Sequence, residues 1–218
     1  MQRFSSIQTR AVEGIPLSPL SKLLFANTRI AWLWFILRLY VSYQWLTSGI
    51  AKLTGHSIAF DSFGKASPGG AWVFTAHGEA GLKGFIASAL AHASGPFPSV
   101  QGWYATFLEH VVLPNVVVFS YLVTFGEVLV GLGLLLGAFT GIAAFFGIVM
   151  NMNYLFAGSI SINPILCVCS LLLVLAWRVS GFWGIDRYLL PLLGTPWTGS
   201  FASPSRAKSL TMTEEQLS

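Results

Sequence analysis

The sequence predicts an all-α fold: a polytopic membrane protein with a four-transmembrane-helix bundle and a long extracytoplasmic segment between its first and second helices. Of its 218 residues, 54% are hydrophobic and only 9% are charged, whereas about 25% of the residues in a soluble domain are charged. The mean hydropathy is +0.68, and residues 128–177 include no charged side chain. This composition excludes a soluble enzyme, a fibrous protein and a disordered chain.

Apolar stretches bounded by helix start and stop signals define the four predicted spans. Pro114 precedes the second span, Gly158 follows the third, and Pro164 falls in the first turn of the fourth, in keeping with the usual places of proline and glycine at helix ends. The predicted spans are residues 30–52, 116–136, 140–157 and 164–179.

Basic residues flank the first and last spans, which orients the chain with both termini in the cytoplasm. The residues concerned are Arg10, Lys22, Arg29, Arg178 and Arg187. The expected location is therefore the cytoplasmic (inner) membrane, in multi-pass form. The predicted organisation is a cytoplasmic N-terminal tail at 1–29, a membrane domain at 30–197 with its extracytoplasmic segment at 53–115, and a polar cytoplasmic tail at 198–218.

The extracytoplasmic segment has few charges, so we expect it to pack on the membrane and not to form a free domain. Residues 79–92 show helical spacing, with Leu82, Phe85, Ile86 and Leu90 on one face. We expect it to lie in the membrane interface, as an amphipathic or a re-entrant helix. Residues 103–112 are predicted to form a second short helix that leads into the second span.

Two ionisable side chains lie deep inside the predicted spans. Arg38 is about 12 Å from the cytoplasmic end of the first span, and Glu127 is about 14 Å from that end of the second, at 1.5 Å per residue. Charges within a membrane are costly and are usually paired or face a cavity. Because the two depths agree, we expect Arg38 and Glu127 to be each other's counter-ions.

Polar and small residues form one face on each of three spans, and these faces can enclose a pocket in the inner half of the membrane. The candidate catalytic residues are Glu127, which would exchange a proton, and Arg38, which would bind an anionic or carbonyl group. The candidate substrate- or quinone-binding residues are Asn151, Tyr154, Trp45 and Tyr43. The alternative is a static Arg–Glu pair that holds the helices in register without any ligand.

The chain has no haem, flavin or metal motif of its own. None of the predicted spans contains histidine, which excludes an intramembrane bis-histidine haem, and the CxxC, GxGxxG and P-loop patterns are absent. Its basic residues are scattered, so no nucleic-acid partner is expected. Cys167 and Cys169 are interpreted as small core residues.

Short runs of arginine, glycine, glutamate and asparagine recur within residues 30–190, at 37–40, 44–52, 128–137, 151–158 and 161–164. The most specific parts are the Gly126-Glu127 run and the stretch from Trp177-Arg178 to Asp186-Arg187. In these runs the chain resembles DoxX/DoxD-type membrane proteins. The resemblance implies a four-helix membrane fold but supplies no catalytic residues.

The resemblance also implies a function, because the best-described members are similar to the membrane subunit of thiosulfate:quinone oxidoreductase. We therefore expect a membrane subunit of an oxidoreductase that passes electrons from thiosulfate or another sulfur compound to quinone. Quinone is then the substrate, and the partners are the lipid bilayer and a second protein subunit or larger membrane complex. The alternative is a non-catalytic anchor or assembly subunit. A small-solute transporter ranks third, since inverted repeats and broken helices are missing.

Overall fold

The computed structural model describes residues 18–76 and 79–192, and all regular elements in these ranges are helices. The all-α prediction is confirmed. Both predicted tails lie mainly or wholly outside the described residues. The elements are α1 (Pro19–Ala26), η1 (Thr28–Ile30), α2 (Ala31–Thr54), α3 (Glu79–Ala91), α4 (Gly102–Phe107), the π-helical η2 (Leu108–Val112), α5 (Val116–Leu136), α6 (Thr140–Phe156), α7 (Asn163–Leu175), α8 (Trp177–Ser180) and α9 (Asp186–Leu192).

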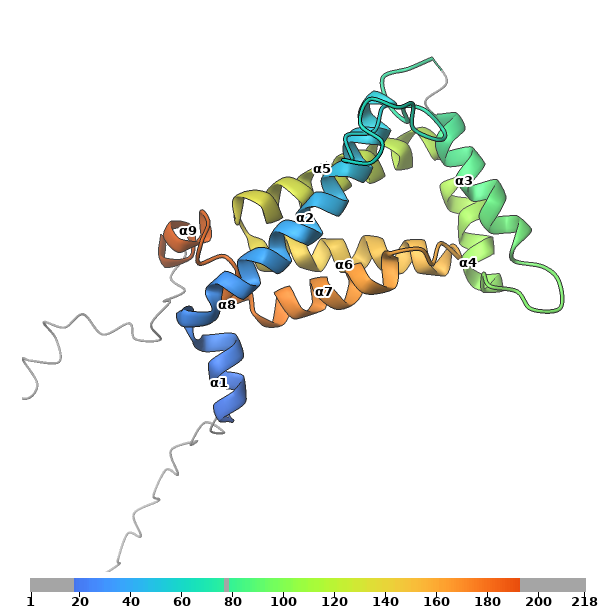
Figure 1. The fold of residues 1–218 in the computed structure, drawn as a ribbon. Coiled ribbons are helices and arrows are strands. Elements are labelled where there is room, and N and C mark those ends of the chain that lie inside the picture. The colour runs from blue at the N-terminus through green and yellow to red at the C-terminus, as the bar shows by residue number, and fades with distance from the viewer. Residues whose placement is uncertain (1–17, 77–78, 193–218) are drawn as a thin grey trace, which may run out of the picture.

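Four long helices, α2, α5, α6 and α7, lie alongside one another and form a bundle (Figure 1). Helices α3 and α4 lie at one end of this bundle, and α1, α8 and α9 lie at the other. We call these the α3–α4 end and the α1–α9 end. Helix α2 runs antiparallel to α5 and forms the most extensive helix pair with it.

The helix boundaries follow from local stop signals. Helix α2 ends at Gly55 (φ 77°) and α5 ends at Gly137 (φ 64°), and a left-handed conformation at this position is one that glycine adopts without strain. Helices occupy all four ranges predicted as spans. The fourth is a correction, because the predicted continuous helix at 164–179 breaks at Ala176 into α7 and α8.

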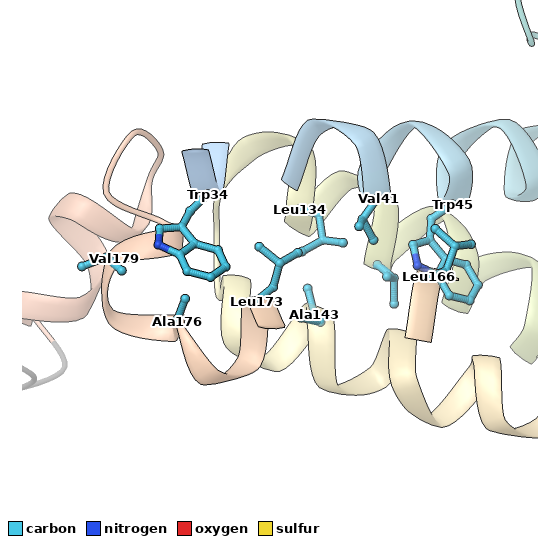
Figure 2. Packing of buried hydrophobic residues seen from close by; sticks show 11 residues of the cluster. Trp34, Val41, Trp45, Leu134, Ala143, Leu166, Leu173, Ala176 and Val179 are labelled. Atoms are coloured by element: carbon cyan, nitrogen blue, oxygen red, sulfur yellow. The ribbon is translucent and has the colours of Figure 1, made fainter. Parts of the chain in front are cut away.

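A row of buried apolar side chains runs along the axis of the bundle (Figure 2). Trp34 and Val179 lie at its α1–α9 end, Leu134 and Leu173 lie in the middle, and Trp45 lies toward the other end. Leu134 and Leu173 are fully buried. Burying each of these side chains contributes roughly 1.5–3 kcal/mol relative to an exposed position.

A second apolar cluster joins the α3–α4 end to the bundle. Leu82, Ile86 and Ala89, the buried face of α3, pack with Trp72 and with residues of α4 and α5. The predicted helices at 79–92 and 103–112 are therefore present, the latter divided into α4 and η2.

The outward faces of the bundle helices are apolar. In the described part of the chain, helix α5 is long and apolar enough to cross a membrane by itself. The pair Pro19–Ala26 and Thr28–Thr54, bent by 55°, would be a second such span if it is counted as one helix. Helices α6 and α7 are shorter apolar helices. The large exposed apolar side chains include Leu122, Leu129, Ile142, Phe145, Phe146, Ile165, Val168, Leu171 and Leu175.

Candidate functional site

Close contact between α2 and α5 places Glu127 inside the bundle. A side chain at Gly49 would put its Cβ 2.8 Å from Val128 Cγ2 and 3.0 Å from Glu127 Cβ, and one at Gly131 would lie 2.7 Å from Leu46 Cγ. Glycine at these two positions lets the helix backbones approach, as small residues do in closely packed helix pairs. The Glu127 side chain, 1% exposed, is thereby held against α2.

The Glu127 carboxylate accepts hydrogen bonds from three side chains. Lys52 Nζ donates to Oε1 (2.8 Å) and Oε2 (2.7 Å), and the Tyr154 hydroxyl donates to Oε1 (2.5 Å). Ser48 Oγ donates to Oε1 over a longer distance of 3.2 Å and accepts a bond from Lys52 Nζ at 2.6 Å. We call Ser48, Lys52, Glu127 and Tyr154 the Glu127 cluster. Its Lys–Glu bonds are charge-assisted and are therefore stronger than neutral ones.

Aromatic rings flank the Lys52 ammonium group. Its Nζ lies 5.1 Å from the centroid of the Trp72 ring and 5.8 Å from that of Tyr154, distances at which cation–π attraction operates. The Trp72 backbone N–H donates to the Lys52 carbonyl oxygen at 2.7 Å. Trp72 in turn packs directly against Gly81 of α3, where a Cβ would collide with its indole ring. The segment at 53–115 thus covers one side of the cluster.

The structure contradicts the expected pairing of Arg38 with Glu127. Arg38 is buried at the α1–α9 end, where Nη1 donates to the Ser180 carbonyl (3.2 Å) and Nη2 to the Trp183 carbonyl (2.9 Å). Lys52, the actual counter-ion of Glu127, lies fourteen positions along α2 from Arg38. That spacing corresponds to about 21 Å along a helix.

The reason lies in the register of α2 against α5. Gly49 faces Val128, Ser42 Oγ donates to the Gly131 carbonyl (2.8 Å), and Arg38 contacts Gly137. Arg38 is therefore level with the end of α5, and the first turns of α2 extend beyond it. The equal depths predicted for Arg38 and Glu127 were counted from the ends of their two helices. That count assumes that α2 and α5 end at the same level, and this assumption is wrong. Trp34, in these extra turns, packs with residues of α7 and α8 instead.

The residues around Arg38 fasten the chain together at the α1–α9 end of the bundle. Asp186, itself 1% exposed, accepts hydrogen bonds from the backbone N–H groups of Phe139 (2.6 Å) and Thr140 (2.8 Å). It thus caps the start of α6, an arrangement that satisfies otherwise unpaired donors. Arg38 and Asp186 together hold the Ser180–Asp186 turn against α2, α5 and α6, which is a structural role.

A polar pocket of about 260 Å³ opens beside the Glu127 cluster. It brings together three of the predicted site residues, Glu127, Trp45 and Tyr154. The rest of its wall is formed by Gln44, Thr47, Ser48, Ser57, Ala59, Ile162, Asn163 and Leu166. Residues that follow α2 and residues at the start of α7 are among them, so the pocket lies toward the α3–α4 end. The sequence placed it in the opposite half of the bundle.

The other two predicted ligand-binding residues lie off the pocket wall. The Tyr43 hydroxyl accepts a hydrogen bond from the Phe60 backbone N–H (3.1 Å), and the two rings stack with centroids 5.4 Å apart. Asn151, one turn before Tyr154 on α6, is fully buried, and among the described residues its side-chain amide has no hydrogen-bond partner.

Three residues at the site were not among the site residues predicted from the sequence: Lys52, Ser48 and Trp72. A signal existed for two of them, because Trp45, Ser48 and Lys52 share one face of α2. A lysine at the end of a span commonly extends toward the membrane surface, whereas the Lys52 side chain is only 16% exposed and turns inward to Glu127. Trp72 lies in a long connection, where the sequence carries no periodic pattern that places a side chain.

An apolar pocket of about 180 Å³ lies on the other side of Tyr154. Tyr154 is the residue that lines both pockets. Apolar and aromatic residues from α3, α4, η2, α5 and α6 form most of the wall, among them Phe85, Leu108, Leu122, Val123, Val149 and Met150.

No protein-family profile, curated protein or solved structure matches the chain. The resemblance to DoxX/DoxD-type proteins thus stays an expectation. Within residues 18–76 and 79–192, no group of three or more His, Cys, Asp or Glu side chains is placed to hold a metal ion. What the described site offers is a buried carboxylate, a phenol that donates to it and an ammonium group that balances its charge, with the first two on a pocket wall.

Proposed function

We propose that the chain is a four-helix protein of the inner membrane, with α2, α5, α6 and the α7–α8 pair as its spans. The apolar outward faces of these helices support the proposal, because soluble proteins rarely expose apolar patches larger than a few hundred Å². Basic residues Lys22, Arg29, Arg178 and Arg187 lie in or beside the helices of the α1–α9 end. The positive-inside rule then assigns that end to the cytoplasm and segment 53–115 to the opposite side.

We further propose that this protein is the membrane subunit of an oxidoreductase and that its polar pocket binds the headgroup of a quinone. The observation that carries the proposal is the Tyr154–Glu127 hydrogen bond on the pocket wall, backed by Lys52. Small-ligand sites typically combine a mostly apolar wall with a few converging polar groups, and intramembrane ionisable residues usually mark function.

The size and lining of the pocket suit a single aromatic-like ring. A cavity of about 150 Å³ in another protein holds benzene, so about 260 Å³ accommodates one substituted ring. Trp45 and Tyr154 lie side by side on the wall, with ring centroids 6.5 Å apart and an interplanar angle of 29°. These flat surfaces would orient a planar headgroup, and the Tyr154 hydroxyl would reach its carbonyl oxygen.

The chemistry needs two electrons and two protons for each quinone reduced to quinol. In the proposed complex the electrons come from a partner subunit, where two thiosulfate ions become tetrathionate and release two electrons. The residues of this chain deliver the protons. Tyr154 would donate its hydroxyl proton to the quinone oxygen. The Glu127 carboxylate would take up a proton from water in the pocket and pass it to the Tyr154 phenolate, which restores both groups, while Lys52 balances the charge of the carboxylate. Two such cycles supply the two protons.

The test is thiosulfate-dependent reduction of tetramethylbenzoquinone by the full chain purified with its partner subunits. We expect Glu127→Gln to lower turnover at least about 100-fold, the usual size of a lost general acid–base contribution. Glu109→Gln is the matched control, because it makes the same change at an exposed glutamate of η2. Normal turnover by folded Glu127→Gln protein would refute the assignment.

A non-catalytic anchor or assembly subunit is the second candidate. The observation in its favour is that Lys52, Ser48 and Tyr154 already bond the Glu127 carboxylate, as a purely structural ion pair would be bonded. This role predicts that the protein copurifies with its partners, carries no quinone, and keeps complex activity when Lys52 and Glu127 are replaced together by Met and Leu.

A further inference from the structure

Three buried polar side chains from three helices lie close to Gly147 of α6. A Cβ at Gly147 would lie 3.3 Å from Trp45 Nε1 of α2 and 3.6 Å from Ser170 Oγ of α7, so these two atoms face the same point. Asn151 follows one turn later on α6. Trp45 is 2% exposed, and Asn151 and Ser170 are fully buried.

Asn151 faces the Trp45 indole as well. Gly147, Asn151 and Tyr154 follow one another at intervals of four and three positions, which places them on one face of α6. The two residues that flank Asn151 on this face both lie beside Trp45. Gly147 lies next to Nε1, and the Tyr154 ring centroid is 6.5 Å from that of Trp45. Asn151 therefore lies next to the same indole, between these two contacts.

None of these polar groups has a hydrogen-bond partner within the described part of the chain. The atoms concerned are Trp45 Nε1, Ser170 Oγ, and Nδ2 and Oδ1 of Asn151. Buried polar groups in folded proteins are nearly always bonded to protein or to ordered water, because an unpaired one lowers stability. Four such atoms around one point indicate a common partner.

Water is the partner that fits these donors and acceptors. The indole N–H can only donate, whereas the Asn151 amide also offers an acceptor oxygen, so the partner must both accept and donate. Internal waters typically make about three hydrogen bonds to buried polar groups, whereas cavities with purely apolar walls stay dry. Glycine at position 147 leaves the space, since a side chain there would extend toward Nε1 and Oγ.

We propose that Trp45, Asn151 and Ser170 bind an internal water molecule beside Gly147, and that this water holds the Trp45 indole in the wall of the polar pocket. Trp45 lines that pocket, whereas Asn151 and Ser170 do not. Asn151 is then a positioning residue that acts on the pocket through Trp45. Water reaches the site during local opening of the structure, and the site does not depend on which ligand the pocket binds.

The direct test is a nuclear Overhauser measurement between water and the indole N–H of Trp45. Full-length protein in detergent is labelled with ¹⁵N in its tryptophan side chains, and the Trp45 signal is the one that Trp45→Phe removes. We expect a cross-peak between this N–H and water. Gly147→Ala should abolish it, because the Cβ fills the space beside Nε1, whereas Gly84→Ala, whose Cβ meets open space on α3, should keep it.

Two results of this measurement would overturn the water site. One is the absence of the cross-peak in the unaltered protein. The other is a cross-peak that persists in Gly147→Ala, because it would then arise from exchange of the Ser170 hydroxyl proton and not from a bound water.

Thermal unfolding tests the same site by the sign of a shift. Ser170→Ala removes one partner of the water, so we expect Tm to fall by about 2–4 °C, the usual effect of losing about one hydrogen bond in a chain of this size. In a dry site the same change would remove an unpaired hydroxyl, and Tm would rise. Ser88→Ala, at an exposed position of α3, measures the contribution of helix propensity alone.

The positioning role has a separate measurement, the ¹⁵N relaxation of the Trp45 indole. Asn151→Leu should lower the order parameter of its N–H to below about 0.6, the range of flexible groups. Trp34 is the control in the same spectra, because its Nε1 donates directly to the Leu24 carbonyl at 2.9 Å and should stay rigid. An unchanged order parameter for Trp45 in Asn151→Leu would overturn the positioning role.

Discussion

Lys52 Nζ lies 2.7 Å from Glu127 Oε2 and joins the last turns of α2 to the middle of α5. Glu127 is 1% and Lys52 16% exposed, so neither charge is well solvated. Removal of one partner from such a pair is costly because the other charge stays buried, whereas replacement of both by apolar residues is often neutral. This asymmetry distinguishes what the pair contributes to stability from what it contributes to chemistry.

We therefore predict that Lys52→Met and Glu127→Leu each lower the free energy of unfolding by about 3–5 kcal/mol. The double variant should regain most of this loss, and thermal unfolding in detergent measures all three proteins. Turnover should stay low in the double variant despite its stability. Recovery of turnover together with stability would contradict the proton-transfer role and favour the anchor.

The helices could be predicted from the sequence because their boundaries depend on local signals. Gly55 and Gly137 end α2 and α5, and Pro164 begins α7. The break at Ala176 carries no such signal: no proline or glycine stands there, and the residues on either side are apolar. After the break, α8 packs against α1 and α2, a tertiary contact that no local sequence pattern encodes.

The site was predicted only in part, because its composition depends on the register between distant helices. Glu127, Trp45 and Tyr154 stand out as polar or aromatic side chains on shared helix faces. The partner of Glu127 depends on the contact of Gly49 with Val128, which sets how far α2 slides along α5. Sequence distance from a helix end does not measure that offset, and so Arg38 was assigned in place of Lys52.

Arg38 provides a test of its structural role. Its guanidinium group bonds two carbonyl oxygens, and hydrogen bonds to charged groups contribute about 1.5–3 kcal/mol each. Arg38→Met should therefore lower the free energy of unfolding by about 3 kcal/mol but leave the affinity for tetramethylbenzoquinone unchanged. Arg178→Met, at an exposed arginine of α8, should alter stability by less than about 0.5 kcal/mol. A marked loss of quinone affinity in folded Arg38→Met protein would contradict the structural role.

The glycines at the α2–α5 contact should tolerate no side chain. Gly49→Ala and Gly131→Ala each place a Cβ within 2.8 Å of a neighbouring atom, and such overpacking costs about 1–3 kcal/mol. Gly49→Ala should also weaken quinone binding, because Gly49 adjoins Ser48 and faces Glu127. Gly84→Ala on α3 is the control: open space surrounds its Cβ position, so stability should stay the same or rise by up to about 1 kcal/mol. Denaturant unfolding measures the stability of the three variants. Equal unfolding free energies for all three would contradict the close packing of α2 against α5.

Tyr104 should make stability fall at high pH. Burial in the apolar cluster of the α3–α4 end raises the pKa of its phenol from 10.0 to about 12, and its hydroxyl donates to Asn153 Oδ1 at 3.1 Å. Between these pH values the unfolded chain has lost a proton that the folded chain keeps, so the stability supplied by this group is complete below pH 10 and declines toward pH 12. The decline amounts to roughly 2–3 kcal/mol at 1.36 kcal/mol per pKa unit. Tyr104→Phe should show a correspondingly shallower fall in unfolding free energy over this range, and parallel curves for the two proteins would rule the effect out.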